Sequence, residues 1–291
     1  MQLLDRYEEV VGHQEVQRLR QLAAFLTGKR IVHVNSTATG GGVAEILGWM
    51  VPLMNELGLD ARWEVIQGPP EFYQVTKAFH NGLQGLPVAL KPKDFELHYE
   101  VNRENAQRLN LQADVVLVHD PQPVYLPRFT PPGQVRCWLW RCHIDASRPD
   151  RSVWRHVEGA IPDYHATIFS MAAFTRPLPR PMYIIPPSID PLSEKNCPIP
   201  ESERLEEGPS AGHPLAERSK RQRATDALGL PGRARAVQHE VALAGVVERG
   251  GRLHGHRVVV GLPAVDGVAH HQSVLEAGGL DRSRHLGERG R

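Results

Sequence analysis

The sequence predicts an α/β protein in which residues 1–190 form a Rossmann-like parallel sheet with helices on both faces. Apolar, β-branched segments alternate with helix-spaced segments up to about residue 190, and one strand passes through a glycine loop into a helix. All 18 aromatic residues and all 5 methionines precede residue 197, so the remainder has few large groups to bury. We therefore expect residues 191–291 to form a poorly ordered tail.

The first predicted elements are a helix, a strand, a glycine loop and a second helix. Val10–Leu26 carries apolar residues at helical spacing, which predicts an amphipathic helix. Arg30–Asn35 is rich in β-branched residues and is predicted to be a strand. Ser36–Gly42 is small and flexible, and Val43–Leu57 returns to helical spacing. This order is typical of a unit that binds a nucleotide or a sugar phosphate.

The rest of the N-terminal part continues the alternation of strands and helices. The continuous apolar run of Asp114–Val118 is typical of a central parallel strand. The other predicted strands are Ala61–Gln67, Val135–Trp140, His165–Phe169 and Met182–Ile185, and the other predicted helices are Glu71–Leu83, Glu96–Leu111 and Ser152–Gly159.

The glycine loop is the first candidate binding element. Gly40, Gly41 and Gly42 allow the backbone to approach a ligand closely, and the following helix directs unpaired N–H groups and its positive dipole end toward the loop. We therefore expect these three glycines to bind substrate at a phosphate. The loop lacks both the G-x-G-x-x-G fingerprint and the Gly-Lys-Ser/Thr of a P-loop, and a tight turn without any ligand is the alternative.

Polar residues also follow two later predicted strands, and the first group comes after the strand Val135–Trp140. His143 and Asp145 come after Val135–Trp140, and we predict them to be catalytic, with His143 contacting a hydroxyl or the reacting oxygen and Asp145 orienting a neighbour. A solvated loop with a structural histidine is the alternative. Arg141 is a candidate substrate-binding residue that pairs with either a phosphate or an internal carboxylate.

Asp120 and Gln122 follow the most hydrophobic strand and are the remaining candidate substrate-binding residues. Asp120 can accept hydrogen bonds from sugar hydroxyls, with Gln122 beside it. The alternative is that Asp120 caps a turn before Pro121. Because ligands of open α/β sheets bind at the carboxyl ends of the strands, the clustering of polar residues there favours a binding site.

Composition excludes several other classes of protein. A net charge of +1 and a tail with 14 basic and 12 acidic residues do not predict nucleic-acid binding. Three cysteines, no signal peptide and no membrane-length apolar run predict a cytoplasmic protein that binds no membrane. No Ser-His-Asp order or zinc spacing is present, and the histidine pair His270-His271 has no cysteine partners, so we expect no metal site.

Four runs of the sequence resemble a known family. The runs Val32–Leu47, Val118–Pro123, Trp140–Asp145 and Ile185–Asn196 are similar, in order, to the trehalose synthases of the glycosyltransferring type. These are retaining family-four glycosyltransferases with the GT-B architecture, in which two Rossmann-like domains face a cleft. The resemblance covers residues 1 to about 196 and implies that the chain begins with the N-terminal half of a GT-B fold, the acceptor-side domain.

The resemblance implies transfer of glucose from a nucleotide-diphosphate glucose to glucose, with retention and without a cofactor. It places Gly40, Gly41 and Gly42 near the donor phosphates, His143 in the acceptor-side histidine region, and Asp120 and Gln122 in a sugar-side loop. The implied partners are a sugar and a nucleotide-sugar. Negative charge on the leaving diphosphate would be stabilised by helix N-termini and cations, with no protein nucleophile.

The resemblance ends where the family's donor-binding domain should begin. The last 95 residues carry 13 arginines against one lysine, Lys220, and show no counterpart of the family's donor-phosphate and ribose loops. We therefore expect an aberrant tail over residues 191–291 and impaired transfer. The alternative is a non-catalytic sugar-binding domain left by a truncated or frame-shifted gene. An uncovered interdomain face would favour association, for which a homodimer is the simplest form.

Overall fold

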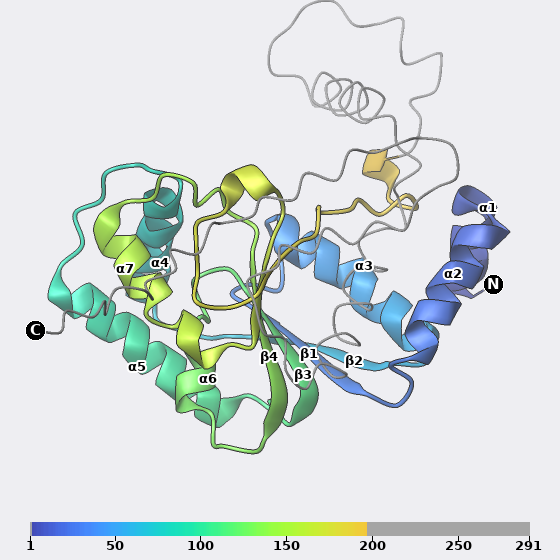
Figure 1. Ribbon diagram of the computed structural model, residues 1–291, viewed down its shortest axis with the longest axis horizontal. Helices are drawn as coiled ribbons and strands as arrows, with labels where there is room; N and C mark the ends of the chain where they lie inside the picture. The colour runs from blue at the N-terminus through green and yellow to red at the C-terminus, as the bar shows by residue number, and fades with distance from the viewer. Residues whose placement is uncertain (1, 197–291) are drawn as a thin grey trace, which may run out of the picture. The chain divides into compact units, whose positions relative to one another are not determined.

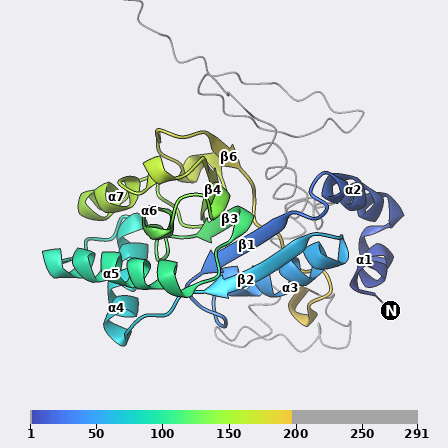
Figure 2. The ribbon, with the colours of Figure 1, turned by 90° about the horizontal axis from the view of Figure 1, so that it is seen from below.

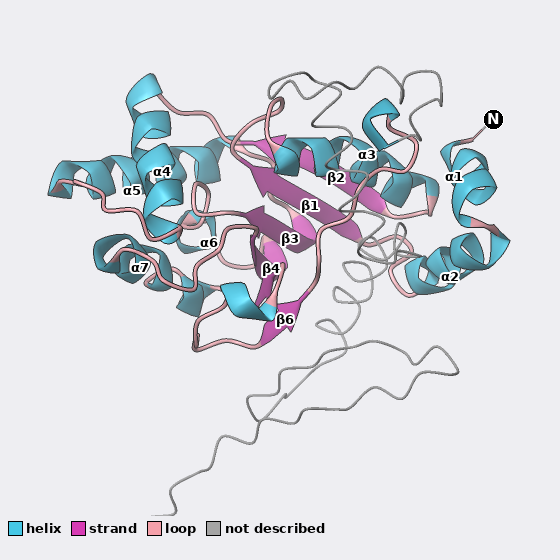
Figure 3. Ribbon diagram, turned by 90° about the horizontal axis from the view of Figure 1, so that it is seen from above, coloured by secondary structure: helices cyan, strands magenta, loops and turns pink. Residues whose placement is uncertain are grey.

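The computed structural model describes residues 2–196, which contain a single six-stranded sheet (Figure 1). The strands are ordered β2-β1-β3-β4-β5-β6, and every neighbouring pair is parallel. Figure 3 labels β2, β1, β3, β4 and β6 in this order across the sheet, and β5 lies between β4 and β6. Their bounds are β1 Arg30–Asn35, β2 Asp60–Val65, β3 Ala113–His119, β4 Val135–Cys142, β5 Ala166–Phe169 and β6 Met182–Ile184.

The order of the strands creates one reversal, between β1 and β3. The chain moves from β1 to β2 on one side and then crosses to β3 on the other side of β1. The loops that leave the carboxyl ends of β1 and β3 therefore diverge and leave a crevice between them. In doubly wound α/β folds this switch point is where ligands bind.

Helices cover both faces of the sheet, and Figures 1 and 2 show the two groups on opposite sides of the strands. The first group is α1 Leu3–Val11, α2 His13–Ala24 and α3 Gly42–Glu56; the second is α4 Pro70–Leu83, α5 Pro92–Arg108, α6 Leu126–Phe129 and α7 Arg151–Glu158. Single turns of 3₁₀ helix occur at η1 Ile161–Asp163, η2 Ala172–Phe174 and η3 Glu194–Asn196.

Alternation along the strands divides the core into two layers. In β1, Val32 and Val34 pack with the second group of helices, whereas Ile31 packs with the first group. Since successive side chains of a strand face opposite sides, His33 lies on the face of Ile31. By the same alternation His119 and Arg141 face that side, so these three polar side chains enter the layer near the carboxyl ends of their strands.

The predicted fold class is confirmed, with a correction at the N-terminus. The single helix predicted over Val10–Leu26 is wrong, because α1 and α2 are separated at Gly12, whose φ of 86° interrupts a helix. The short helix α6 was not predicted. The predictions for residues 197–291, including His270-His271, lie outside the described residues, and the boundary at residue 190 stays a prediction. Within the described chain no helix is long and apolar enough to cross a membrane.

Candidate functional site

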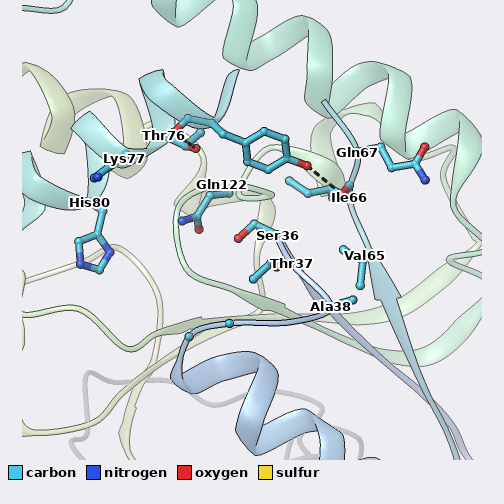
Figure 4. Close-up of a pocket in the computed structure, with 13 residues that line it drawn as sticks. Ser36, Thr37, Ala38, Val65, Ile66, Gln67, Thr76, Lys77, His80 and Gln122 are labelled. Carbon is cyan, nitrogen blue, oxygen red and sulfur yellow. Dashed lines mark hydrogen bonds between the residues drawn. The ribbon is translucent and has the colours of Figure 1, made fainter. Parts of the chain in front are cut away.

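An open groove lies at the switch point of the sheet. It has a volume of about 1010 Å³ and is bounded by the loop after β1, by the end of β2, by Gln122 after β3 and by one face of α4. In Figure 4, Gln122 lies between the α4 side chains Lys77 and His80 and Ser36 of the loop after β1. The lining residues are Ser36, Thr37, Ala38, Gly40, Gly41, Val65, Ile66, Gln67, Tyr73, Thr76, Lys77, His80 and Gln122.

The glycine loop forms one wall of this groove. Gly40 and Gly41 have φ values of 74° and 96°, which residues with a Cβ rarely adopt. Gly41 is the residue that precedes α3, and it has no side chain to cap the helix. The N–H groups of the first turn of α3 are therefore available to an anion, which the helix dipole also favours.

Hydrogen bonds at the end of β1 hold the start of this loop. Asn35 Nδ2 donates to the Thr37 carbonyl at 2.9 Å, and Trp63 Nε1 of the neighbouring strand donates to Asn35 Oδ1 at 2.7 Å. Thr37 Oγ1 donates to the Thr39 carbonyl at 2.6 Å. Asn35 is buried, so both ends of its amide are used to fix the path of the chain toward the glycines.

Gln122 lines the groove, and hydrogen bonds hold its backbone in place. Its carbonyl oxygen lies 2.9 Å from His98 Nε2 and accepts a hydrogen bond from Asn102 Nδ2 at 3.0 Å. Its side-chain Oε1 is buried and has no hydrogen-bond partner among the described residues. A buried acceptor without a donor is uncommon in native proteins, so this oxygen is suited to a ligand that brings an O–H or N–H group.

His98 is joined to a second histidine within a cluster of aromatic rings. His98 Nδ1 lies 3.0 Å from His156 Nε2, and the rings of Phe79 and Phe95 pack against His156. Burial lowers the pKa of His98 to about 3 and the pKa of His156 to about 4. Both rings are therefore neutral at pH 7.

A second polar group lies at the ends of β3 and β4. The Asp120 N–H donates to the Arg141 carbonyl at 2.8 Å, and Asp120 Oδ1 accepts from the His143 N–H at 2.8 Å. Asp120 has a φ of 62°, which aspartate tolerates better than most residues. Burial raises the pKa of Asp120 to about 7, although the hydrogen bond from His143 and the charge of Arg141 oppose this shift.

Arg141 and Asp145 differ sharply in their surroundings. Arg141 is buried, which lowers its pKa to about 10, and the negative charge of Asp120 works against that shift. Whether Arg141 pairs with a phosphate or with an internal carboxylate stays a prediction. Asp145 accepts a hydrogen bond from the Ser147 N–H at 2.9 Å, and hydrogen bonds from Ser147 lower its pKa. Asp145 thus closes a turn in the loop after β4.

The structure places the predicted site residues in two neighbouring groups. Gly40, Gly41 and Gln122 line the groove, and Gly42 is the first residue of α3. The other predicted residues do not line the groove: Asp120, Arg141 and His143 form the polar group at the ends of β3 and β4, and Asp145 lies in the turn that follows. Their roles in binding and catalysis stay predictions.

Sequence reasoning missed the contribution of α4. Tyr73, Thr76, Lys77 and His80 bring an aromatic ring, a hydroxyl, a cation and an imidazole to the groove. Their spacing of three or four residues, which puts them on one helix face, is a signal that the sequence does contain. His33 was also missed, because a lone histidine in a strand is more often a core residue than a functional one.

Among the described residues, no group of three or more His, Cys, Asp or Glu side chains is arranged to hold a metal ion. The groove itself offers hydrogen-bonding groups, a helix N-terminus and the Lys77 cation.

A parallel, doubly wound sheet with a groove at its switch point defines a Rossmann-like ligand-binding domain. Residues 33–176 match the family model of the trehalose synthase N-terminal domain. This part of the chain belongs to the trehalose synthase glycosyltransferases, as the resemblance in the sequence predicted.

Sequence similarity to individual proteins points to the same family. The chain is 47% identical over 206 residues to a trehalose synthase of Pyrococcus horikoshii. This alignment covers 69% of this chain and 49% of that protein. The chain is 42% identical over 197 residues to a trehalose synthase of Rubrobacter xylanophilus, which is 65% of this chain and 47% of that protein. A trehalose phosphorylase of Pleurotus pulmonarius is 27% identical over 180 residues, or 53% of this chain and 24% of that protein. The chain spans about half the length of the trehalose synthases it matches.

Proposed function

We propose that residues 1–190 are the acceptor-side domain of a trehalose-forming glucosyltransferase and that they bind glucose in the groove at the switch point. The observation that carries this proposal is Gln122 Oε1, a buried acceptor without a partner in a groove that a member of this family would use for sugar. Sugar hydroxyls are hydrogen-bond donors, so a bound glucose satisfies this oxygen.

The reaction that we propose is transfer of glucose from a nucleotide-diphosphate glucose to glucose, with retention at the anomeric carbon. The C–O bond to the diphosphate breaks, the acceptor hydroxyl forms the new bond on the same face, and its proton passes to the leaving phosphate. Negative charge develops on that phosphate. Two features of this domain would stabilise this negative charge. They are the N–H groups before and within the first turn of α3 and the ammonium group of Lys77.

We propose that transfer by this chain is impaired relative to its sugar binding. The groove that the described residues form is open, and an open site excludes water poorly. The second candidate function is therefore a sugar-binding domain without turnover, which the open groove favours. An assay for trehalose from nucleotide-glucose and glucose separates the two: measurable transfer supports the enzyme, and binding without transfer supports the binding domain.

Calorimetry of the full chain with glucose and with trehalose tests the binding site itself. We expect Gln122→Leu to weaken glucose binding about tenfold, because a hydroxyl loses its acceptor in the groove. Gln112→Leu is the matched control, since Gln112 is exposed outside the groove. Equal affinities for the two variants would contradict the proposed site.

The proposed domain boundary has its own test. We expect limited proteolysis followed by mass spectrometry to leave a resistant core that ends near residue 190. A resistant full-length chain would contradict the boundary and weaken the case for impaired transfer.

A further inference from the structure

Three histidine rings form a hydrogen-bonded chain across the ends of β1, β3 and β4. His33 Nδ1 lies 3.0 Å from His119 Nε2, and His119 Nδ1 lies 2.9 Å from His143 Nε2. The rings are stacked, with centroids 5.3 Å apart at each step. His33 and His119 are buried, and only His143 is partly exposed. We call His33, His119 and His143 the strand-end histidine chain.

All three rings are neutral at pH 7. Burial lowers the pKa of His33 to about 3 and the pKa values of His119 and His143 well below their usual range. The nearby positive charge of Arg141 lowers each of them further. Each ring therefore carries one proton on one of its two nitrogens.

This proton count allows only two arrangements. Each N···N contact needs one proton between its two nitrogens, and three rings supply three protons for two contacts. Either every ring is protonated at Nδ1, which leaves a bare lone pair on His33 Nε2, or every ring is protonated at Nε2, which leaves a bare lone pair on His143 Nδ1. A change at one end of the strand-end histidine chain therefore changes the other end.

The buried end decides between these arrangements. His33 Nε2 is buried and has no hydrogen-bond partner among the described residues. A buried N–H without an acceptor is rarer in native structures than a buried acceptor without a donor. The arrangement with a lone pair on His33 Nε2 is thus favoured, and it puts the third proton on Nδ1 of the partly exposed His143.

We propose that the strand-end histidine chain holds His143 in its Nδ1–H tautomer, so that His143 offers a hydrogen-bond donor to an oxygen of a sugar that extends from the groove toward the ends of β3 and β4. This role rests on the proposed function, because it takes a sugar as the ligand. His143 in this state binds and orients an oxygen and does not remove a proton from it. His33 and His119 are positioning residues that act through His143. The Asp120 carboxylate, which accepts the His143 backbone N–H, fixes the loop that carries the ring.

The tautomers are tested directly by ¹⁵N NMR of the full chain labelled at histidine, at pH 7 and without sugar. We expect the protonated nitrogen to be Nδ1 in His33, His119 and His143, with assignments from single His→Gln variants. In contrast, His98 should be protonated at Nε2, because that nitrogen faces the carbonyl oxygens of Pro121 and Gln122. An Nε2–H tautomer or a charged ring at His143 would overturn the proposal.

The positioning role is tested by calorimetry with glucose. His119→Phe removes both N···N contacts, and we expect about tenfold weaker glucose binding together with loss of the single Nδ1–H signal of His143. His33→Asn keeps an amide in place of the donating nitrogen and should retain the tautomer of His143 and most of the affinity. The surface variant His13→Gln is the control.

The outcomes of the NMR and calorimetry experiments show which part of the proposal is wrong. If His119→Phe leaves both the His143 tautomer and the affinity unchanged, the positioning role is overturned. If the wild-type chain shows the expected tautomers but binds no glucose, the proposed function and the sugar contact of His143 are overturned, whereas the protonation of the chain stands. If His119→Phe does not fold, the wild-type spectrum and His33→Asn still decide the tautomer.

Discussion

The domain contains two buried histidine networks that differ in how they end. In the first, His98 Nε2 faces the carbonyl oxygens of Pro121 and Gln122 at 3.1 and 2.9 Å, and His98 Nδ1 faces His156 at 3.0 Å. In the second, the strand-end histidine chain, neither terminal nitrogen meets a carbonyl oxygen among the described residues.

On this basis we interpret the first network as structural and propose a functional role for the second. The carbonyl oxygens allow one tautomer of His98 only, so the first network is closed and holds the backbone of Gln122 in place. The strand-end histidine chain is open at His143, where a ligand can complete it. A buried histidine is therefore informative about function only when its hydrogen-bond partners are counted to the end of the network.

The largest expected effect is on stability in acid, and it acts on both networks. The pKa is about 3 for His33 and His98, about 4 for His156, and well below 6.5 for His119 and His143. These rings are neutral in the folded chain but gain protons in the unfolded chain below pH 6.5. Stability therefore falls as pH falls, by up to about 1.4 kcal/mol per pH unit for each ring.

Asp120 acts in the opposite direction. Its pKa of about 7 lies above the value of about 4 in the unfolded chain, so its protonation stabilises the folded chain as pH falls toward 4. Five histidines outweigh one carboxylate, and we expect a net loss of roughly 5 kcal/mol of unfolding free energy between pH 7 and 5.5. Urea unfolding at these two pH values measures it, and constant stability would mean that the rings are not buried and neutral.

The second prediction separates the two networks by mutation. His98→Leu removes a partner from His156 and from the carbonyl oxygens after β3, and we expect a loss of about 3 kcal/mol in the free energy of unfolding. His33→Leu removes one contact and also the partnerless Nε2, so we expect a loss of only about 1 kcal/mol. Urea unfolding at pH 7 compares them. A larger loss for His33→Leu would reverse the assignment of the closed network as the structural one.

The smallest effect concerns the glycines of the open site. Gly41→Ala puts a Cβ on a residue with a φ of 96°, and we expect a loss of about 1–2 kcal/mol. Gly48 lies inside α3 with no atom near the position of a Cβ, so Gly48→Ala should stabilise the chain by about 0.5–1 kcal/mol. Thermal unfolding measures both. Equal responses would show that the positive φ at Gly41 is not required.

Much of the fold followed from patterns along the chain. The β-branched residues of β1, the apolar run of β3 and the helical spacing of α3 predicted a parallel α/β domain, and the structure confirms it. The division of α1 from α2 was not predicted, because the amphipathic pattern runs through Gly12 and only its φ of 86° separates the helices. Local periodicity therefore gives the type of an element more securely than its ends.

The site was predictable only where it lies at strand ends. Gly40, Gly41 and Gln122 were expected in a binding site because they follow predicted strands, and they do line the groove. Lys77 and His80 come from a helix that could pack against either face of a sheet until the strand order is known.

The sequence by itself determined the α/β class, the glycine loop and the membership of residues 33–176 in the trehalose synthase family, because these depend on local spacing and ordered motifs. The tertiary structure alone decided that His33 meets His119, 86 positions away, and that His119 meets His143. The register of parallel strands sets such contacts, and burial then removes the water that would otherwise complete their hydrogen bonds. For this reason the protonation of His143 is a property of the folded sheet and not of its own loop.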